Sequence, residues 1–250
     1  MPKKTAGRFP NKTPEDYLLE EGDLVTNPET RTPVVICVDC SFSMRQQRRL
    51  DRVLEGLDSF CRDMERDPIA RDSAELCIIS YGGPMARVER DFATPDRILE
   101  QGLPRLTADG ATPLADAVKT ALENLELRKR RYRDNGITWY RPWLILIGDG
   151  DESQSPRELA HAAELLKAES DAKHLNVLCI TVGDEQRMKC ASLMTLSPDG
   201  RIQYLRDMKF QEFFAWLSRS IEKTSQSMSG EEVRYDPTTT WGEVLERKQR

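Results

Sequence analysis

Apolar and polar residues follow two different periods along the chain, and the changes of period divide it into strands and helices. Four runs are almost continuously apolar over six or seven residues, which is typical of strands buried on both faces of a sheet. We predict these strands at 34–39, 75–81, 143–148 and 176–182. A fifth segment, 85–92, alternates Val88 with charged neighbours, as expected for an edge strand that pairs antiparallel to 75–81.

Helical periodicity occupies most of the sequence between these strands. In 45–65, Leu50, Val53, Leu54, Leu57 and Phe60 recur at helical spacing. Proline marks two helix starts, because its fixed backbone angle suits the first turn. We predict helices at 45–65, 95–101, 113–127, 155–170 and 211–223, with two short apolar segments, 191–196 and 202–205, around a Pro-Asp-Gly turn.

Strands that alternate with helices and are buried on both faces predict a doubly wound α/β fold of the Rossmann-like type. Its sheet is mostly parallel with one antiparallel edge strand, and right-handed crossovers place helices on both faces. The pattern fades at both ends, so we divide the chain into a polar N-terminal arm (1–32), one domain (33–225) and a C-terminal tail (226–250). In the tail, Trp241, Val244 and Leu245 are candidates for a small docking helix.

Composition is consistent with one large domain that has a highly charged surface. Of 250 residues, 38% are apolar and 32% charged, and no apolar run approaches the roughly 20 residues of a membrane helix. The first residues carry no secretion signal, so we expect a cytoplasmic chain without membrane contact. Three of six cysteines, Cys37, Cys77 and Cys179, fall in strands, which favours reduced thiols that pack as small apolar groups.

The candidate chemistry lies where predicted strands and loops end. Asp39 ends the first strand, with hydroxyls at Ser41 and Ser43 after it; Thr112 precedes a helix, and Asp149 follows another strand. Carboxylates and hydroxyls are oxygen ligands that suit Mg²⁺ or Mn²⁺ better than Zn²⁺. Each element also has a simpler explanation, since Ser and Thr cap helices and an Asp-Gly pair forms turns. Their joint occurrence at strand and loop ends favours a metal site.

The set Asp39-x-Ser41-x-Ser43, Thr112 and Asp149 resembles the metal-ion-dependent adhesion site (MIDAS) of the von Willebrand factor A (vWA) domain family. The resemblance implies that these five residues hold Mg²⁺ or Mn²⁺, and that Asp149 acts through a bridging water. It also implies a non-catalytic protein-binding module, in which an Asp or Glu carboxylate of a partner completes the coordination.

Within that family the chain is similar to the bacterial TerY-like (tellurite-resistance) group, in its size, its Tyr81-Gly-Gly sequence and its Gly110-x-Thr112-Pro-Leu sequence. This implies a scaffold or signalling role in a stress-response or phage-defence system, with a kinase or phosphatase as partner. Two positions depart from the family pattern. Phe42 replaces a small residue beside the metal, and Gly148 replaces a threonine whose loss could loosen Asp149.

Haloacid-dehalogenase (HAD)-like phosphatases offer an alternative, because they also place an Asp after the first strand and an acidic turn such as Gly148–Asp151 later. In that interpretation Asp39 is the nucleophile of a Mg²⁺-dependent phosphohydrolase. Such enzymes need a second Asp two residues on as general acid and base. That position is Ser41 here, which argues against an enzyme.

Other chemistry has little support. Neither His161 nor His174 stands in a nucleophile motif, and no Gly-rich phosphate loop is present. The basic run 128–133 is the candidate for nucleic-acid contact, but the net charge of −5 argues against that partner. We predict instead that the run is the solvated end of a helix. The acidic segment 15–23 is a candidate partner for these arginines.

Overall fold

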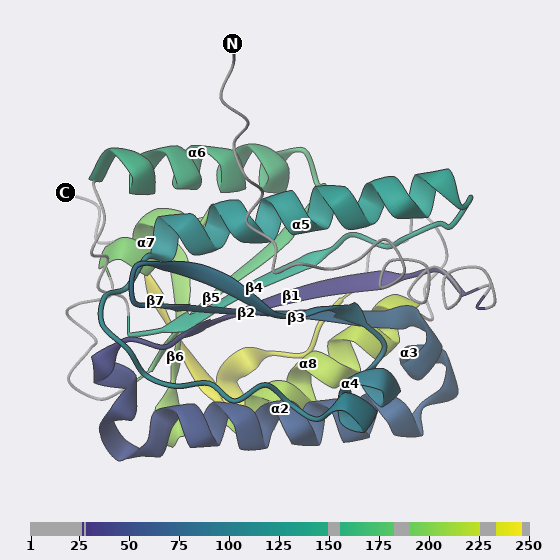
Figure 1. Cartoon of the computed structure of the whole chain (residues 1–250), viewed down its shortest axis with the longest axis horizontal. Coiled ribbons are helices and arrows are strands. Elements are labelled where there is room, and N and C mark those ends of the chain that lie inside the picture. Colours follow the sequence, from purple (N-terminus) through teal and green to yellow (C-terminus); the bar gives the residue numbers. More distant parts are fainter. Residues whose placement is uncertain (1–26, 28, 150–155, 183–190, 226–233, 247–250) are drawn as a thin grey trace, which may run out of the picture.

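The central sheet contains seven strands in the order β3-β2-β1-β4-β5-β6-β7 (Figure 1), in a computed structural model that describes residues 27, 29–149, 156–182, 191–225 and 234–246. The strands are β1 (Thr32–Asp39), β2 (Ala74–Gly82), β3 (Met85–Ala93), β4 (Trp143–Gly148), β5 (Asn176–Val182), β6 (Arg201–Leu205) and β7 (Gly242–Glu246). The five central strands run parallel, whereas β3 and β7 pair antiparallel at the two edges. The predicted fold class is confirmed, and β7 adds a second antiparallel edge.

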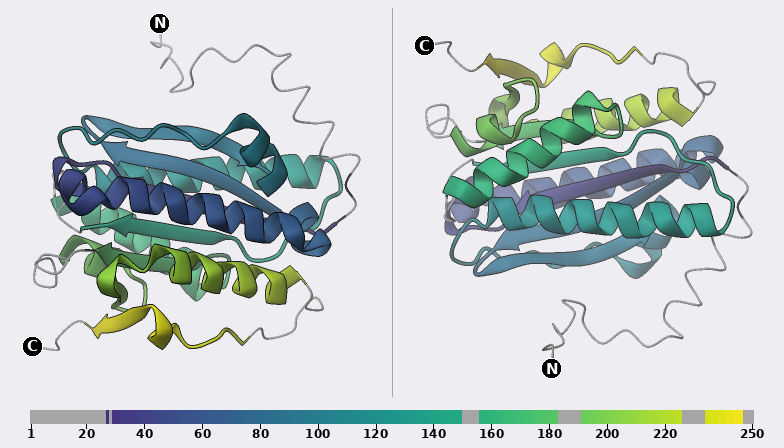
Figure 2. Two further views of the ribbon diagram at one scale, coloured as in Figure 1. Left: turned by 90° about the horizontal axis from the view of Figure 1, so that it is seen from below. Right: turned by 90° about the horizontal axis from the view of Figure 1, so that it is seen from above.

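Helices cover both faces of this sheet (Figure 2). One layer contains α2 (Arg49–Arg66), α3 (Pro68–Ser73), α4 (Pro95–Gln101) and α8 (Phe210–Ser225). The other contains α5 (Leu114–Asp134), α6 (Pro156–Asp171) and α7 (Ala191–Leu196). Three short 3₁₀ helices complete the described residues: η1 (Phe42–Arg48), η3 (Arg206–Met208) and η4 (Thr238–Thr240).

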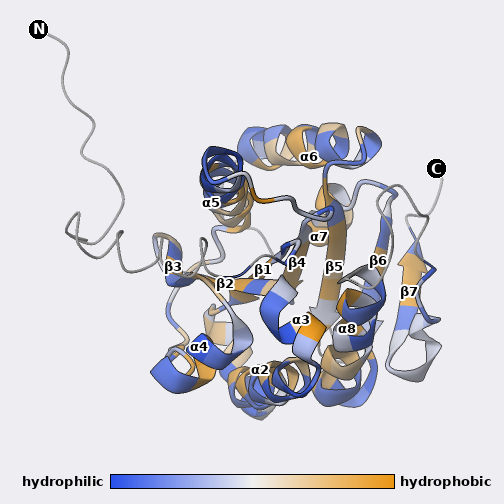
Figure 3. Cartoon of the chain, turned by 90° about the vertical axis from the view of Figure 1, so that its right-hand side faces the viewer, coloured by the Kyte–Doolittle hydropathy of each residue, from blue (hydrophilic) through white to orange (hydrophobic). Residues whose placement is uncertain are grey.

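Successive side chains of each central strand point to opposite faces of the sheet and pack in two separate cores. Along β1, Val34, Ile36 and Val38 pack in the core beneath α2 and α8, whereas Val35 and Cys37 pack beneath α5. This is the two-sided burial that a continuously apolar strand predicts. The apolar strands lie between helices whose outer faces are largely hydrophilic (Figure 3).

The C-terminal residues differ from the predicted tail. Instead of a small docking helix, residues 242–246 form β7, in register with β6. Trp241, just before it, is fully buried, with its ring 5.0 Å from that of Phe213 and 5.4 Å from that of Trp216. The helix prediction is wrong: the spacing of Trp241, Val244 and Leu245 suits one helical face, but Trp241 is buried alone, whereas Val244 in the following edge strand is exposed.

The basic run is a solvated helix end only in part, since Arg130 and Arg133 are exposed but two other residues of the run are buried. Helix α5 continues through it to Asp134, and Arg128 and Tyr132 are buried. Their common partner is Glu75 at the start of β2: Arg128 Nε lies 2.7 Å from one carboxylate oxygen and the Tyr132 hydroxyl donates to the same atom. Arg31 Nε lies 3.1 Å from the other oxygen. The acidic segment 15–23 lies outside the described residues.

Two further observations bear on the chain's environment. Five cysteines, Cys37, Cys40, Cys61, Cys77 and Cys179, are buried free thiols, whereas Cys190 lies outside the described residues. Among the residues that the structure describes, no helix has both the length and the apolar character needed to cross a membrane.

Candidate metal centre

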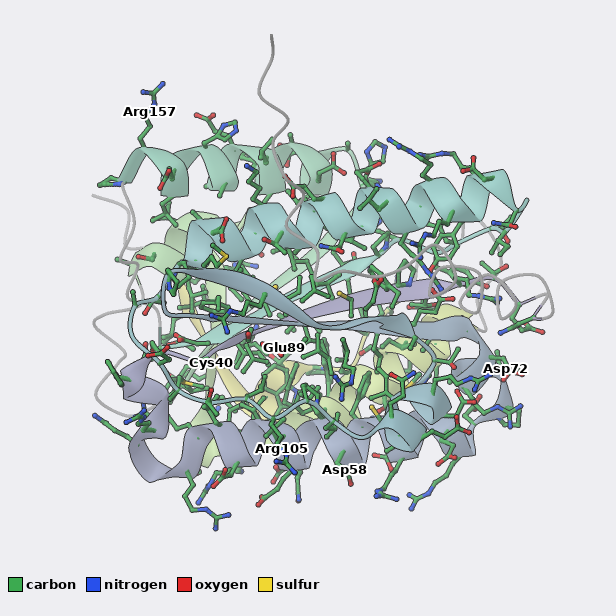
Figure 4. The ribbon with its side chains drawn as sticks, in the orientation of Figure 1. Cys40, Asp58, Asp72, Glu89, Arg105 and Arg157 are labelled. Atoms are coloured by element: carbon green, nitrogen blue, oxygen red, sulfur yellow. The ribbon has the colours of Figure 1, made fainter. Side chains whose placement is uncertain are left out.

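Two adjacent parallel strands bring the two candidate aspartates to one end of the sheet. Strand β1 pairs with β4, Asp39 is the last residue of β1, and Asp149 directly follows β4. After β1 the chain enters the α2 layer, and after β4 it reaches α6 in the opposite layer. This is a topological switch point, where open α/β sheets bind ligands. In Figure 4, Cys40 marks this end of the sheet and Asp72 marks the opposite end.

The turn after β1 brings together the first three predicted ligands. The backbone N–H of Ser41 donates to Asp39 Oδ1 at 2.7 Å, and the hydroxyl oxygens of Ser41 and Ser43 lie 2.8 Å apart. Neither serine side chain caps the short helix η1, which is the alternative role that its position offered. The other carboxylate oxygen, Asp39 Oδ2, is buried without a hydrogen-bond partner. This turn is therefore chemically suited to a group that binds a carboxylate oxygen, such as a hydrogen-bond donor or a cation.

Close packing brings the end of β4 against Asp39. A methyl group added to Gly148 would contact the Tyr81 hydroxyl and lie 2.8 Å from Asp39 Oδ2. The Tyr81 hydroxyl donates to the Ile147 carbonyl at 2.8 Å. Thus Gly148 is required by the approach of Tyr81, which fills the space that a larger residue would take. Asp149 Oδ2 is likewise buried without a hydrogen-bond partner.

Thr112 is buried at the end of a loop that lies against the serine turn. The loop is held by a 2.6 Å hydrogen bond from the Asp109 N–H to the Cys40 carbonyl. Arg45 adds a second contact, since its Nη2 donates to the Ala108 carbonyl at 2.8 Å. Pro113, rather than Thr112, occupies the cap position of α5. The fold therefore brings the loops of all five predicted ligands to the same end of the sheet.

The site is electrostatically unfavourable for two bare carboxylates. Burial, and after it the negative charge of Asp149, raise the pKa of Asp39 from 3.8 to about 7, although hydrogen bonds from Ser41 and from the Asp149 backbone oppose the shift. A carboxyl with a raised pKa binds its proton more tightly, because its charge is poorly stabilised. A divalent cation would supply that stabilisation.

Arg49 is the charged residue that sequence reasoning missed here. It begins α2, and its Nη1 lies 3.7 Å from Asp149 Oδ2, with side-chain exposures of 4% and 3%. The same nitrogen is 3.4 Å from the Ser43 carbonyl. A signal was available in the sequence: Arg49 shares a helical face with the buried residues Val53 and Phe60. Its burial could not be expected from its residue type, because arginine is rarely fully buried unless it is paired.

Phe42 forms the exposed rim of the site. It lies between the two serines and is 56% exposed, and the Arg45 guanidinium lies 4.9 Å from its ring centroid. The ring is therefore displayed at the surface and steadied by a cation–π contact. An incoming group would meet an aromatic ring and a positive charge beside the turn.

The donor set fits a hard divalent cation. Two aspartates provide charge, three hydroxyls provide neutral oxygens, and one oxygen of each aspartate is buried without a hydrogen-bond donor. Within the described ranges, no group of three or more His, Cys, Asp or Glu side chains could hold a metal ion. An ion here would thus depend on the hydroxyls, a chemistry that suits Mg²⁺ or Mn²⁺. Asp151, part of the acidic turn considered for a phosphatase, lies outside the described residues.

Comparison with known proteins agrees with this architecture. Residues 34–152, from β1 past Asp149, match the family model of the von Willebrand factor type A domain, a module that typically mediates protein interactions. No curated protein sequence matches the chain.

Solved structures show the same fold at low sequence identity. The chain is similar to the vWF domain of the type V pili tip protein Mfa5 from Porphyromonas gingivalis (TM-score 0.60, 13% identity, 81% of this chain and 99% of that one). It is also similar to the pilus adhesin SpaC from Lactobacillus rhamnosus GG (TM-score 0.59, 13% identity, 79% of this chain and 31% of that one). For proximal thread matrix protein 1 from the mussel byssus the TM-score is 0.51 and the sequence identity 14%. The match covers 78% of this chain and 49% of that protein, so the chain spans about half its length.

Proposed function

We propose that this chain, whose residues 34–152 match the von Willebrand factor A domain, is a non-catalytic, Mg²⁺-dependent protein-binding module. The observation that carries the proposal is the pair of buried aspartate oxygens without hydrogen-bond donors, Asp39 Oδ2 and Asp149 Oδ2, at the ends of two adjacent strands. Buried oxygens without donors are unfavourable unless another group satisfies them, and a cation does so.

Each residue would have a separate task in holding the ion. Asp39 and Asp149 would provide the charge, and Ser41, Ser43 and Thr112 would provide neutral oxygens. The ion supplies a positive centre that attracts a carboxylate. Because Mg²⁺ keeps octahedral geometry and retains waters where protein ligands are few, an Asp or Glu carboxylate of a partner could complete its coordination.

The rim would provide contacts beyond the ion. Phe42 presents an exposed ring, and Arg45, stacked on it, adds a positive charge. We therefore expect the partner's acidic residue to have an apolar neighbour that contacts Phe42. These features favour an acidic protein segment over nucleic acid, whose phosphates would need a larger basic surface.

At the cellular scale, we propose a cytoplasmic scaffold or signalling component of a bacterial stress-response or phage-defence system. The resemblance to the TerY-like group in Tyr81-Gly-Gly and Gly110-x-Thr112-Pro supports this, and it favours a kinase or phosphatase partner. A pull-down from a bacterial lysate with and without chelator, followed by mass spectrometry, would identify proteins whose capture depends on the ion.

The metal assignment predicts a difference between two aspartate variants. A ligand at about 100 times its dissociation constant stabilises the native state by roughly 2.7 kcal/mol. Saturating Mg²⁺ should therefore raise the Tm of the wild type by several degrees and leave Asp39→Ala unchanged, as measured by thermal unfolding with Mg²⁺ or EDTA. Asp109→Ala, an exposed aspartate on the neighbouring loop, is the matched control and should respond as the wild type does.

Two results would contradict the proposal. Equal Mg²⁺-dependent increases in the Tm of wild type and Asp39→Ala would contradict the assignment of the metal site. Robust hydrolysis of a generic phosphate ester with Mg²⁺, abolished by Asp39→Asn, would instead favour the phosphohydrolase.

A further inference from the structure

Arg49 is a buried cation beside two buried aspartates. Its Nη1 is 3.7 Å from Asp149 Oδ2, and both side chains are almost fully buried. Its Nε is buried without a hydrogen-bond partner, as is Asp149 Oδ2. The contact is therefore a charge–charge approach without a well-formed hydrogen bond, which leaves Asp149 Oδ2 chemically available.

The backbone and the packing of α2 hold Arg49 in this place. The preceding Arg48 has a left-handed backbone (φ 55°) and turns outward, where it pairs with Asp51 and Glu55. Arg49 starts the next turn on the buried face of the helix. Two consecutive arginines thus have opposite environments, and the one that faces the site is fixed by the fold of the chain.

The guanidinium changes the charge of the site. With both aspartates ionised, as they would be when they hold a cation, the two carboxylates and the guanidinium of Arg49 have a formal charge of −1, whereas the two carboxylates alone would have −2. A divalent ion brings the first set to +1 and the second to zero. Since charges interact strongly where water is excluded, a site with a net charge of +1 attracts an anion, whereas a site with zero net charge attracts it little.

We propose that Arg49 sets the specificity of the site, so that it weakens the hold on the ion and strengthens the capture of a partner's carboxylate. This rests on the metal-dependent function proposed above. Arg49 repels the incoming cation and shares Asp149 with it, but it leaves the loaded site with a net positive charge. A site without Arg49 would bind the ion tightly and have little attraction for an acidic group.

The first test measures ion affinity in the full chain. Mn²⁺ is titrated by calorimetry into wild type, Arg49→Met, Arg49→Lys and Arg52→Met. An arginine beside an aspartate typically lowers the pKa of the carboxyl by about 1–3 units, which weakens its affinity for a proton by tenfold or more, and we expect an effect of this order on a metal ion. We expect Arg49→Met to bind Mn²⁺ about tenfold more tightly than wild type. Arg49→Lys, which keeps the charge, should stay within about threefold, and Arg52→Met, an exposed arginine on the same helix, should not differ.

The second test measures anion capture. Thermal unfolding at saturating Mn²⁺ is compared in chloride and in acetate, a minimal carboxylate, at equal ionic strength. Acetate should raise the Tm of wild type and Arg52→Met, and the increase should be much smaller in Arg49→Met. Asp39→Ala should show no increase, which controls for acetate effects away from the site.

The outcomes separate this inference from the proposed function. If wild type binds no Mn²⁺, the metal-dependent function is wrong. If wild type binds Mn²⁺ but Arg49→Met has the same or weaker affinity, or an unchanged acetate response, the role of Arg49 is wrong. Arg49→Lys guards against misfolding, because it keeps the charge and much of the side-chain volume; a folded Arg49→Lys that behaves as Arg49→Met would also overturn the inference.

Discussion

Gly148, the residue before Asp149, lies so close to Tyr81 that no side chain fits between them. The phenol occupies this space and donates to the Ile147 carbonyl. A threonine at position 148, the family residue noted in the sequence, would collide with both the phenol and Asp39. Sequence reasoning predicted a loosened Asp149 from the loss of a hydroxyl, because it could not place Tyr81. The packing around Gly148 provides a physical reason for the glycine.

The change Gly148→Ala should destabilise the protein by about 1–3 kcal/mol, because overpacking forces the phenol or the Asp39 carboxylate to move. Chemical denaturation measures the loss. The double variant Gly148→Ala/Tyr81→Phe should lose less than the sum of the single variants, because removal of the hydroxyl relieves part of the collision. Additive losses would mean that Tyr81 and position 148 do not compete for the same space.

The candidate ligands were more predictable than their surroundings. Asp39, Ser41 and Asp149 could be located from sequence because each follows a recognisable apolar strand, and parallel strands bring such ends together. Arg49 and Tyr81 could not, since the role of each depends on contacts across the sheet. Whether the five predicted ligands bind an ion stays a prediction.

At the scale of the elements, periodicity located four of the five central strands, the edge strand β3 and most helices. It erred where local pattern and long-range packing disagree. The predicted helix at 45–65 is divided into η1 and α2 by the left-handed backbone of Arg48. Helix α5 continues seven residues beyond its predicted end at 127, because Arg128 and Tyr132 find a buried partner in Glu75. The local sequence around Arg128 does not indicate that its partner Glu75 lies 53 residues earlier in the chain.

The sequence pattern did not predict strand β7 or its contribution to stability. Trp241 is fully buried among the aromatic rings of α8, next to a strand that completes the sheet. Trp241→Ala should therefore cost about 3–5 kcal/mol, as large core truncations do. Urea denaturation measures it. Val244→Ala, in β7 itself and 45% exposed, is the control and should cost less than about 1 kcal/mol. Similar small losses for both would show that the burial of Trp241 contributes little to stability.

At the scale of the whole molecule, the sheet separates two charged clusters. The aspartates and Arg49 lie where β1 and β4 end, whereas Glu75 lies where β2 begins, with Arg31 and Arg128. The second cluster also fixes the segment before β1, since Arg31 bonds the carbonyls of Asn27 and Glu29. One end of the sheet thus holds the candidate binding site, and the other holds a structural ion cluster.

This separation predicts that stability and ion binding can be changed independently. Glu75→Gln leaves two buried arginines without a countercharge, so we expect a loss of about 3–5 kcal/mol in the free energy of unfolding. The Mg²⁺-dependent increase in Tm should stay as in wild type, which thermal unfolding with and without EDTA measures. Glu123→Gln, an exposed glutamate on α5, should change neither quantity. A reduced Mg²⁺ response in Glu75→Gln would show that the two ends are coupled.

The burial of the cysteines has a practical consequence for chemical labelling. A thiol reacts as its thiolate, and burial raises the pKa of Cys40, Cys61 and Cys179 to about 12 and raises that of Cys37 and Cys77 as well. These five thiols should be nearly inert to maleimides in the native protein. With Cys190 replaced by serine, Phe42→Cys would therefore provide one reactive position on the rim of the site. A fluorophore attached there would report on the arrival of a partner without disturbing either core.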